Sequence, residues 1–308
     1  MEPTVRQRYL ALFSLFASLP AMAITFQTRL EKVEWKVDGD QFECRLSQDI
    51  TDFGQGQFVR RAGEQVTFRL QARERWLGAG SATLVAAAAP WQPGRGDINL
   101  GMVNVVDNGP MPFNSTQQQG TRLLTGLLEG RSPLVRHRTP DGGEGIEVRL
   151  MPVKFNKAYH DYLDCTTKLL PVNYDQIKQA QINFPGGGAD LDDVSRAKLE
   201  IILQYMKADP SVNHIELDGH SDNGGNRLTN LDMSRRRGLA VTEYFKANGI
   251  PESQIVLRFH GERYPLVPNT NAANRAKNRR VTVHLSRDPM PPAPTTPATA
   301  PIKPAATS

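Results

Sequence analysis

The sequence predicts an α+β protein made of two successive domains. Its 308 residues are enough for two domains of ordinary size. From residue 24 to about 150, apolar and polar residues alternate between glycines, which predicts a β-rich domain, barrel- or sandwich-like, with one or two helices. From residue 177, strand patterns alternate with helical ones. This order predicts a β-α-β-α-β-(α)-β domain with helices on one side of a sheet.

Strands in the first domain are clearest at 42–46, 66–70 and 146–150, where every second residue is apolar. One helix is expected between an N-cap at Ser115 and a stop at Gly130, with four leucines on its apolar face. A second helix is expected over 157–169. The segment 171–176 then reads as a hinge, which gives domains at 24–170 and 177–287.

The second domain begins with an apolar run at Ile182 and Phe184, followed by a helix from Asp190 or Asp192 to about residue 208. Its stripe of Leu191, Val194, Ile201, Ile202 and Tyr205 is expected to be buried. The remaining expected elements are a strand from 215, a helix over 227–249, strands at 255–259 and 281–285, and a short polar helix or loop at 269–278.

Both ends of the chain differ from the domains between them. Residues 1–23 have the pattern of a secretory signal, with Arg6 and Arg8 before a short apolar run and Ala-Met-Ala at 21–23. That run is too short to span a bilayer comfortably, so we expect cleavage before Ile24 and not an integral membrane protein. From residue 288 the chain is rich in Pro, Thr and Ala and is expected to be disordered.

The two cysteines, Cys44 and Cys165, bear on the compartment and on stability. Export into an oxidising compartment favours a disulfide between them, and the alternative is two buried free thiols. A bridge across so long a loop would be worth at most about 4.7 kcal/mol in the chain-entropy model.

Composition argues against several classes of function. The net charge of +5 is diffuse, and no basic stripe is interleaved with aromatics, so nucleic acid is not an expected partner. His214, His220 and His260 lack the spacing of a metal site, and no cofactor motif is present. Ser221 next to His220 is a poor nucleophile pair because neighbouring residues of an extended segment point to opposite faces. The sequence therefore predicts a site that binds without catalysis.

The candidate site is the stretch from residue 215 to 238, where a strand runs into a polar, glycine-rich loop and then a helix. Asn230, Ser234 and Arg237 fall at i, i+4 and i+7 and so form one row on that helix. Asp222 in the loop can take an ammonium, and Arg237 can take a carboxylate in bidentate fashion, so together they suit a zwitterion. Taken alone, Asp222 could equally cap the helix, and Arg237 could be a surface charge.

The motifs of this region resemble OmpA-like peptidoglycan-binding domains. The resemblance rests on the run 218–222, on Asn230 and the run 233–237, on Gly261-Glu262 before Tyr264-Pro265, and on the run 275–281. It implies that Asp222 and Arg237 bind diaminopimelate of the peptidoglycan stem peptide, with Asn230 and Ser234 as further candidate contacts. His220 is expected to be a structural hydrogen-bonding residue, and Arg279 and Arg280 are expected to pair with carboxylates that brace the domain.

Three positions depart from the family pattern. Ser221, Met233 and Gly238 stand where the family usually has Thr, Leu and Ala. A glycine within a helix costs about 1 kcal/mol relative to alanine, so Gly238 is expected to loosen the helix locally. None of these changes removes a group that the resemblance assigns to the ligand.

Apart from the tail, the whole chain resembles the MotY type of periplasmic flagellar motor protein, including its opening at 24–29 and the segment 163–165. The resemblance implies a non-catalytic component of a sodium-type polar motor, located in the periplasm between cell wall and outer membrane. Its N-terminal domain would dock on the basal-body ring and help recruit stator units. The alternatives are a general envelope-tethering protein with another partner, or a peptidoglycan hydrolase with its catalytic centre in the β-rich domain.

Overall fold

The structure is a computed structural model that describes residues 23–89, 91, 94–106, 109–138 and 145–287. The predicted signal sequence, apart from residue 23, and the predicted disordered tail lie outside the described residues. The chain divides into two compact units. Residues 45–60 and 65–164, with the strands before residue 39, form the N-terminal unit, and residues 165–287 form most of the C-terminal unit.

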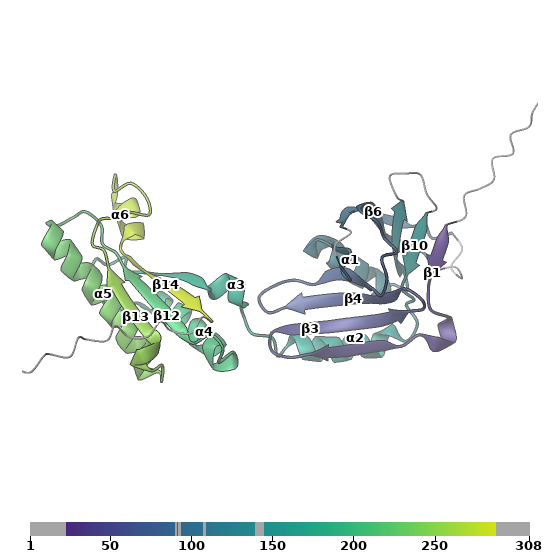
Figure 1. Ribbon diagram of the computed structural model, residues 1–308, viewed down its shortest axis with the longest axis horizontal. Coiled ribbons are helices and arrows are strands. Elements are labelled where there is room, and N and C mark those ends of the chain that lie inside the picture. Colours follow the sequence, from purple (N-terminus) through teal and green to yellow (C-terminus); the bar gives the residue numbers. More distant parts are fainter. Residues whose placement is uncertain (1–22, 90, 92–93, 107–108, 139–144, 288–308) are drawn as a thin grey trace, which may run out of the picture. The chain divides into compact units, whose positions relative to one another are not determined.

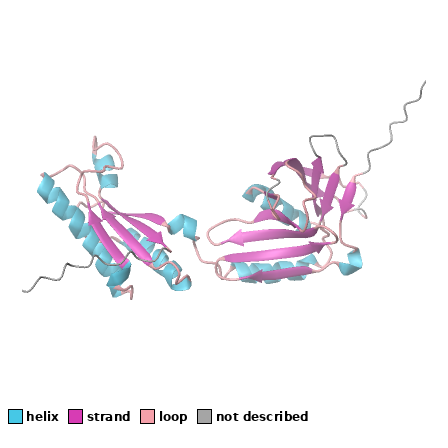
Figure 2. Cartoon of the chain, in the orientation of Figure 1, coloured by secondary structure: helices cyan, strands magenta, loops and turns pink. Residues whose placement is uncertain are grey.

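The N-terminal unit contains two sheets, as its alternating sequence predicted (Figures 1 and 2). The first has the strand order β2-β3-β4-β5-β8, with bounds Trp35–Gly39, Glu43–Ile50, Gly54–Arg61, Thr67–Ala72 and Phe113–Asn114. The second has the order β1-β10-β9-β6-β7, with bounds Ile24–Phe26, Ile146–Arg149, Ser132–Arg138, Gly80–Ala87 and Ile98–Val105. β1 runs parallel to β10, which aligns Ile24 with Ile146.

Two helices accompany these sheets. Helix α1, Gln117–Leu128, begins with a capping box between Thr116 and Gln119, one residue later than predicted. The predicted cap, Ser115, instead accepts a hydrogen bond at its hydroxyl from the Phe68 amide, 2.8 Å away, which ties the helix start to β5. Helix α2, Phe155–Thr166, packs Phe155 edge-on against Trp35 of β2, with ring centroids 5.1 Å apart.

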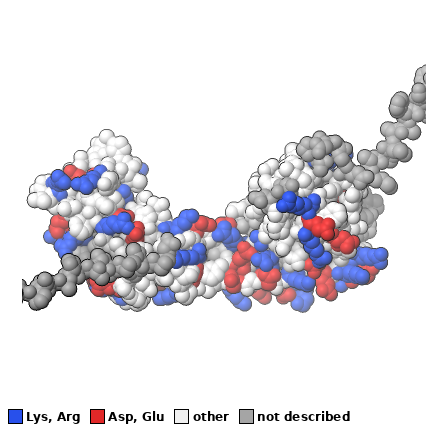
Figure 3. Space-filling model, viewed as in Figure 1, with Lys and Arg blue, Asp and Glu red and all other residues white. Residues whose placement is uncertain are grey.

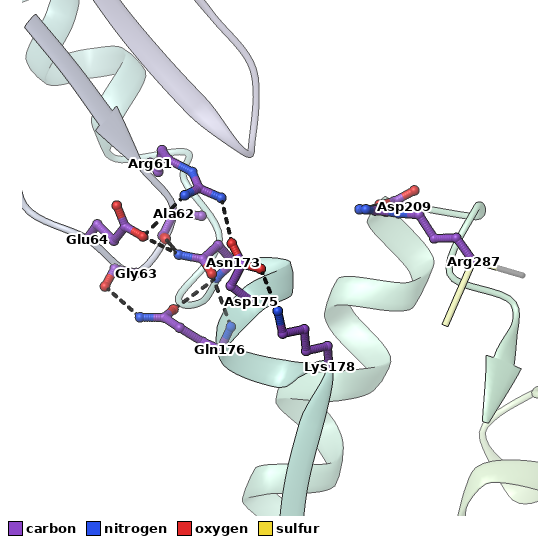
Figure 4. A network of polar contacts seen from close by, with 10 residues as sticks. All are labelled: Arg61, Ala62, Gly63, Glu64, Asn173, Asp175, Gln176, Lys178, Asp209 and Arg287. Carbon is purple, nitrogen blue, oxygen red and sulfur yellow. Dashed lines mark hydrogen bonds and ion pairs between the residues drawn. The ribbon is translucent and has the colours of Figure 1, made fainter. Parts of the chain in front are cut away.

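Two turns, residues 39–44 and 61–64, belong by their contacts to the C-terminal unit. Cys44 forms a disulfide with Cys165, which confirms the predicted pairing. Phe42 packs edge-on against Tyr205 at 5.5 Å. Residues 61–64 bond to the start of helix α3, Tyr174–Ile177 (Figure 4).

A network of polar contacts joins residues 61–64 to the start of helix α3. The Asn173 amide donates to the Ala62 carbonyl at 3.1 Å and to the Glu64 carboxylate at 2.8 Å (Figure 4). Asp175 accepts from Arg61 at 3.4 Å and from Lys178 at 3.0 Å. Helix α3 therefore begins within the segment that the sequence indicated as a hinge, and Asn173 there is 5% exposed.

The C-terminal unit is built on a sheet of order β11-β14-β12-β13, with bounds Gln179–Asn183, Arg280–Ser286, His214–Gly219 and Ile255–Phe259 (Figure 1). β12 is parallel to β13 and antiparallel to β14. The helices are α4, Asp193–Ala208, α5, Arg227–Ala247, and α6, Ala272–Asn278. Asp192, one of the two predicted helix starts, caps α4 by accepting from the Ser195 amide at 2.8 Å.

The core of this unit lies between one face of the sheet and helices α4 and α5. Ile215, Leu217, Val281 and Val283 point into it from the strands, and Val241 and Phe245 meet them from α5. Within the stripe that was predicted to be buried, Val194 is 66% exposed. It lies in the first turn of α4, where the periodicity does not fix which residues face the sheet.

The surface gives two further findings. Lys and Arg are interspersed with Asp and Glu on the visible face of each unit (Figure 3). Among the described helices, none combines the length and the apolarity needed to cross a bilayer.

Candidate functional site

The candidate site lies where β12 ends and α5 begins. Gly219 ends the strand so close to α5 that a Cβ atom there would approach the Ser234 carbonyl oxygen to within 2.3 Å. Glycine is therefore required by the close approach of two backbones. Asn226 then caps α5 by accepting from the Thr229 amide at 2.9 Å. Between these points the loop 220–226 carries Asp222.

Arg237 is buried at this point, with 1% of its surface exposed. Its three guanidinium nitrogens donate to backbone carbonyls: Nε to Gly188 at 2.9 Å, Nη1 to His220 at 3.1 Å and Nη2 to Gly187 at 2.6 Å. Burial lowers the pKa of Arg237 to about 10, opposed by the nearby charge of Asp222, so the group is charged at neutral pH. Each nitrogen of the guanidinium group therefore donates one hydrogen bond to the protein backbone.

Asp222 has its own arginine partner, Arg279, whose Nη1 lies 2.8 Å from Oδ2. The other carboxylate oxygen accepts from the Gly224 amide at 3.0 Å. Burial raises the pKa of Asp222, but these hydrogen bonds and the charges of Arg279 and Arg237 outweigh it, so the pKa lies below its usual value. With a side chain that is 18% exposed, Asp222 is an ionised carboxylate that remains accessible to solvent.

The two arginines hold one short segment between them. Arg279 donates to the carbonyls of Phe184, at 3.0 Å, and Pro185, at 2.6 Å. Arg237 holds the glycines that follow. The glycine-rich turn after β11 therefore lies against Arg237, and two of its carbonyl oxygens accept hydrogen bonds from that guanidinium group.

The other members of the predicted row also bond to the protein. Asn230, 4% exposed, donates to the Gly225 carbonyl at 3.1 Å and to the Glu262 carboxylate. Ser234 is fully buried, donates to the Leu231 carbonyl at 2.7 Å and accepts from the Gly261 amide at 3.0 Å. Both side chains thus fix the loop and the turn around the site.

His220 and Arg280 lie behind the loop. His220 is 6% exposed, and its ring lies tilted against that of His260, with the ring centroids 5.1 Å apart. Burial, followed by the charges of Arg280 and His260, lowers the pKa of His220 to about 4, so its ring is neutral at pH 7. Arg280 donates a hydrogen bond to the Tyr264 carbonyl at 3.3 Å, and the negative charge of Asp218 acts on its guanidinium group. Among the described residues, Nε and Nη1 of Arg280 find no partner.

The sequence missed two features of this site. No role was predicted for the carbonyl oxygens of Gly187 and Gly188, although three consecutive glycines signal an unusual backbone. Glu262 was quoted as part of a motif but given no role. Within the described residues, no group of three His, Cys, Asp or Glu side chains is arranged to hold a metal ion.

Comparisons with known proteins separate the chain into the same two parts. Residues 26–171 match the family described as the MotY N-terminal domain, and residues 183–279 match the OmpA family. The sodium-type flagellar protein MotY of Vibrio parahaemolyticus is 25% identical over 261 residues, which cover 83% of this chain and 88% of that protein. The outer-membrane lipoprotein YfiB of Pseudomonas aeruginosa is 35% identical over 89 residues, which cover 29% of this chain and 52% of YfiB. The C-terminal domain of Helicobacter pylori MotB aligns with a TM-score of 0.33 and 22% identity, over 35% of this chain and 85% of that one.

Proposed function

We propose that this chain, a MotY-type protein with a C-terminal domain of the OmpA family, binds peptidoglycan as a component of a flagellar motor. In finer terms, it is a non-catalytic anchor of a sodium-type polar motor. The N-terminal domain docks on the basal-body ring and helps stator units to assemble. The C-terminal domain holds the assembly to the cell wall.

One observation carries this proposal: the two family matches occur in order in a single chain, and one MotY is similar over 88% of its length. A peptidoglycan-binding domain by itself would suit many envelope proteins. YfiB, for example, is similar only over 29% of this chain. The match to the MotY N-terminal domain is what favours a flagellar motor over a general envelope tether.

In the proposed complex with the cell wall, Asp222 is the side chain that contacts the ligand without any rearrangement of the site. It is ionised, and part of it is accessible, so it suits the ammonium of diaminopimelate. Arg237 would bind the carboxylate of the same residue only after the Gly187 and Gly188 carbonyls move away. A side chain on Gly187 would meet nothing within 4 Å, so this turn has space to move.

The proposed location is the periplasm, at the basal body between the cell wall and the outer membrane. A cleavable signal at 1–23 would deliver the chain there. Residues 24–170 would then form the docking domain, residues 171–176 its connection, and residues 177–287 the wall-binding domain.

Deletion of the gene tests the motor role. Loss of swimming with filaments still assembled, restored by the wild-type gene, is the expected result, because stators without an anchor cannot transmit torque. A tagged protein should localise to the flagellated pole. A deletion strain that swims normally would contradict the motor role, and a pull-down that recovers outer-membrane proteins without basal-body proteins would favour a general tether.

The non-catalytic character has its own test. Purified protein incubated with sacculi should release no muropeptides, since we propose binding without bond cleavage. Release of soluble fragments that depends on protein concentration would instead indicate a hydrolase.

A further inference from the structure

A pocket that is separate from the candidate site lies at the turn that follows β13. Its volume is about 410 Å³, and it is lined by Arg227, Leu231, Phe259, Gly261, Glu262 and Arg263, together with His260. The lining comes from the first turns of α5, from the end of β13 and from the chain that follows it. We call it the arginine pocket. The proposed ligand contacts Asp222 and Arg237 do not line it.

The arginine pocket is joined to the loop of Asp222 by direct bonds. The Gly261 carbonyl accepts from the Ser221 amide at 2.9 Å, and Ser221 immediately precedes Asp222. The Gly261 amide donates to Ser234, and the Glu262 carboxylate accepts from Asn230. The turn that contains Gly261 and Glu262 therefore contacts the loop of Asp222 and also lines the arginine pocket. A peptide ligand that binds at Asp222 and is longer than one amino acid can therefore extend toward the arginine pocket.

The lining of the arginine pocket carries more positive than negative charge, with two arginines and one glutamate. Arg227 and Arg263 are both exposed, and neither forms an ion pair with a described residue. The carboxylate of Glu262, which accepts a hydrogen bond from the Asn230 amide, supplies one negative charge against these two positive charges. Phe259 and Leu231, 41% and 37% exposed, add apolar surface to the lining of the same pocket. Guanidinium groups bind carboxylates in bidentate fashion, and apolar surface suits the methylene groups beside such a carboxylate.

We infer that the arginine pocket is a second subsite, which binds the free carboxylate of an acidic residue next to the zwitterion held at Asp222. The inference rests on the proposed binding of peptidoglycan peptides. It adds a preference that the first site alone cannot produce: the protein distinguishes a peptide with a free carboxylate from the same peptide with that carboxylate amidated.

The test uses two synthetic ligands, γ-D-glutamyl-diaminopimelate and the analogue in which the glutamyl carboxylate is an amide, with free diaminopimelate as reference. In titration calorimetry at low salt, the wild-type protein should bind the free acid at least about tenfold more tightly than the amide, because charge-assisted hydrogen bonds are lost in the amide. In Arg227→Ala/Arg263→Ala this preference should disappear, while binding of free diaminopimelate stays unchanged.

Arg235→Ala is the matched control, since it removes an exposed arginine from the same helix without touching the arginine pocket. It should keep the preference. Equal binding of acid and amide by the wild-type protein, with diaminopimelate still bound, would overturn the second subsite and leave the proposed function standing. If the wild-type protein binds none of the three ligands, both proposals fail.

Discussion

The neutral ring of His220 makes stability depend on pH. In the folded chain its pKa is about 4, because the ring is buried and faces Arg280 and His260, with Asp218 acting in the opposite direction. In the unfolded chain the ring titrates near its ordinary value of about 6.5. Protons therefore bind first to the unfolded state, and stability is lost as the pH falls from about 6.5 to about 4. The full loss is at most about 3.4 kcal/mol.

Urea unfolding at pH 7 and pH 5 measures this loss, with the C-terminal unit followed by pulse-labelling hydrogen exchange on peptides that cover β12. Tryptophan fluorescence would not report it, since the three tryptophans are Trp35, Trp76 and Trp91. His220→Asn should reduce the difference between the two pH values. Equal wild-type midpoints at pH 7 and pH 5 would show that His220 titrates normally.

Arg237 illustrates what a sequence can and cannot say about a single side chain. The i, i+4, i+7 spacing placed it correctly in a row with Asn230 and Ser234. That spacing did not reveal that the row faces inward, because polar residues at helix spacing usually face solvent. The three carbonyl partners come from Gly187, Gly188 and His220, far along the chain or on another element, and no local pattern encodes such contacts.

Helix α1 shows how backbone packing can outweigh helix propensity. Gly120 lies in its first turn, and a Cβ atom there would lie 2.6 Å from the Val66 carbonyl oxygen and 2.8 Å from the Thr67 Cα. Both atoms belong to the backbone, so they cannot move aside cheaply. Gly120→Ala should therefore lower the free energy of unfolding by about 1–3 kcal/mol, although alanine gains about 1 kcal/mol in an open helix.

The control is Thr121→Ala, which changes the next, exposed residue of α1. It should leave stability unchanged or raise it slightly, since alanine is the better helix former. Urea unfolding followed by tryptophan fluorescence reports both variants, because all three tryptophans precede α1 in the N-terminal unit. A stabilised Gly120→Ala protein would show that α1 and β5 do not pack as closely as described.

The elements themselves were largely predictable, whereas their order in the sheets was not. Alternation located the strands at 255–259 and 281–285, and Asp192 marked the start of α4. Nothing in those patterns says that β14 lies between β11 and β12. Strand pairing depends on contacts between distant residues, such as Asp218 opposite Thr282, and periodicity carries no such information.

The disulfide encloses most of the N-terminal unit in one covalent loop, since Cys44 and Cys165 are 121 positions apart. A bridge of this span restricts the unfolded chain and is worth up to about 4.7 kcal/mol in the chain-entropy model. Cys44→Ser/Cys165→Ser should therefore unfold at a lower urea concentration than the oxidised wild-type protein, as measured by tryptophan fluorescence.

Reduced wild-type protein provides the matched comparison and should behave like the double variant. A mass increase after reduction and alkylation, absent without reductant, would establish that the bridge was present at the start. Identical urea midpoints for the oxidised and reduced proteins would mean that the bridge contributes nothing to stability.

The proposed anchoring of the chain to the cell wall would depend on Asp222, and co-sedimentation with purified sacculi at neutral pH tests this most directly. Asp222→Asn keeps the shape of the side chain but removes its charge, and loss of one partner from a charged pair costs about 2–5 kcal/mol. The wild-type protein and Arg235→Ala should sediment with the sacculi, whereas Asp222→Asn should stay in the supernatant with its fold intact. Sedimentation of Asp222→Asn to the same extent as the wild type would contradict the proposed role of this carboxylate.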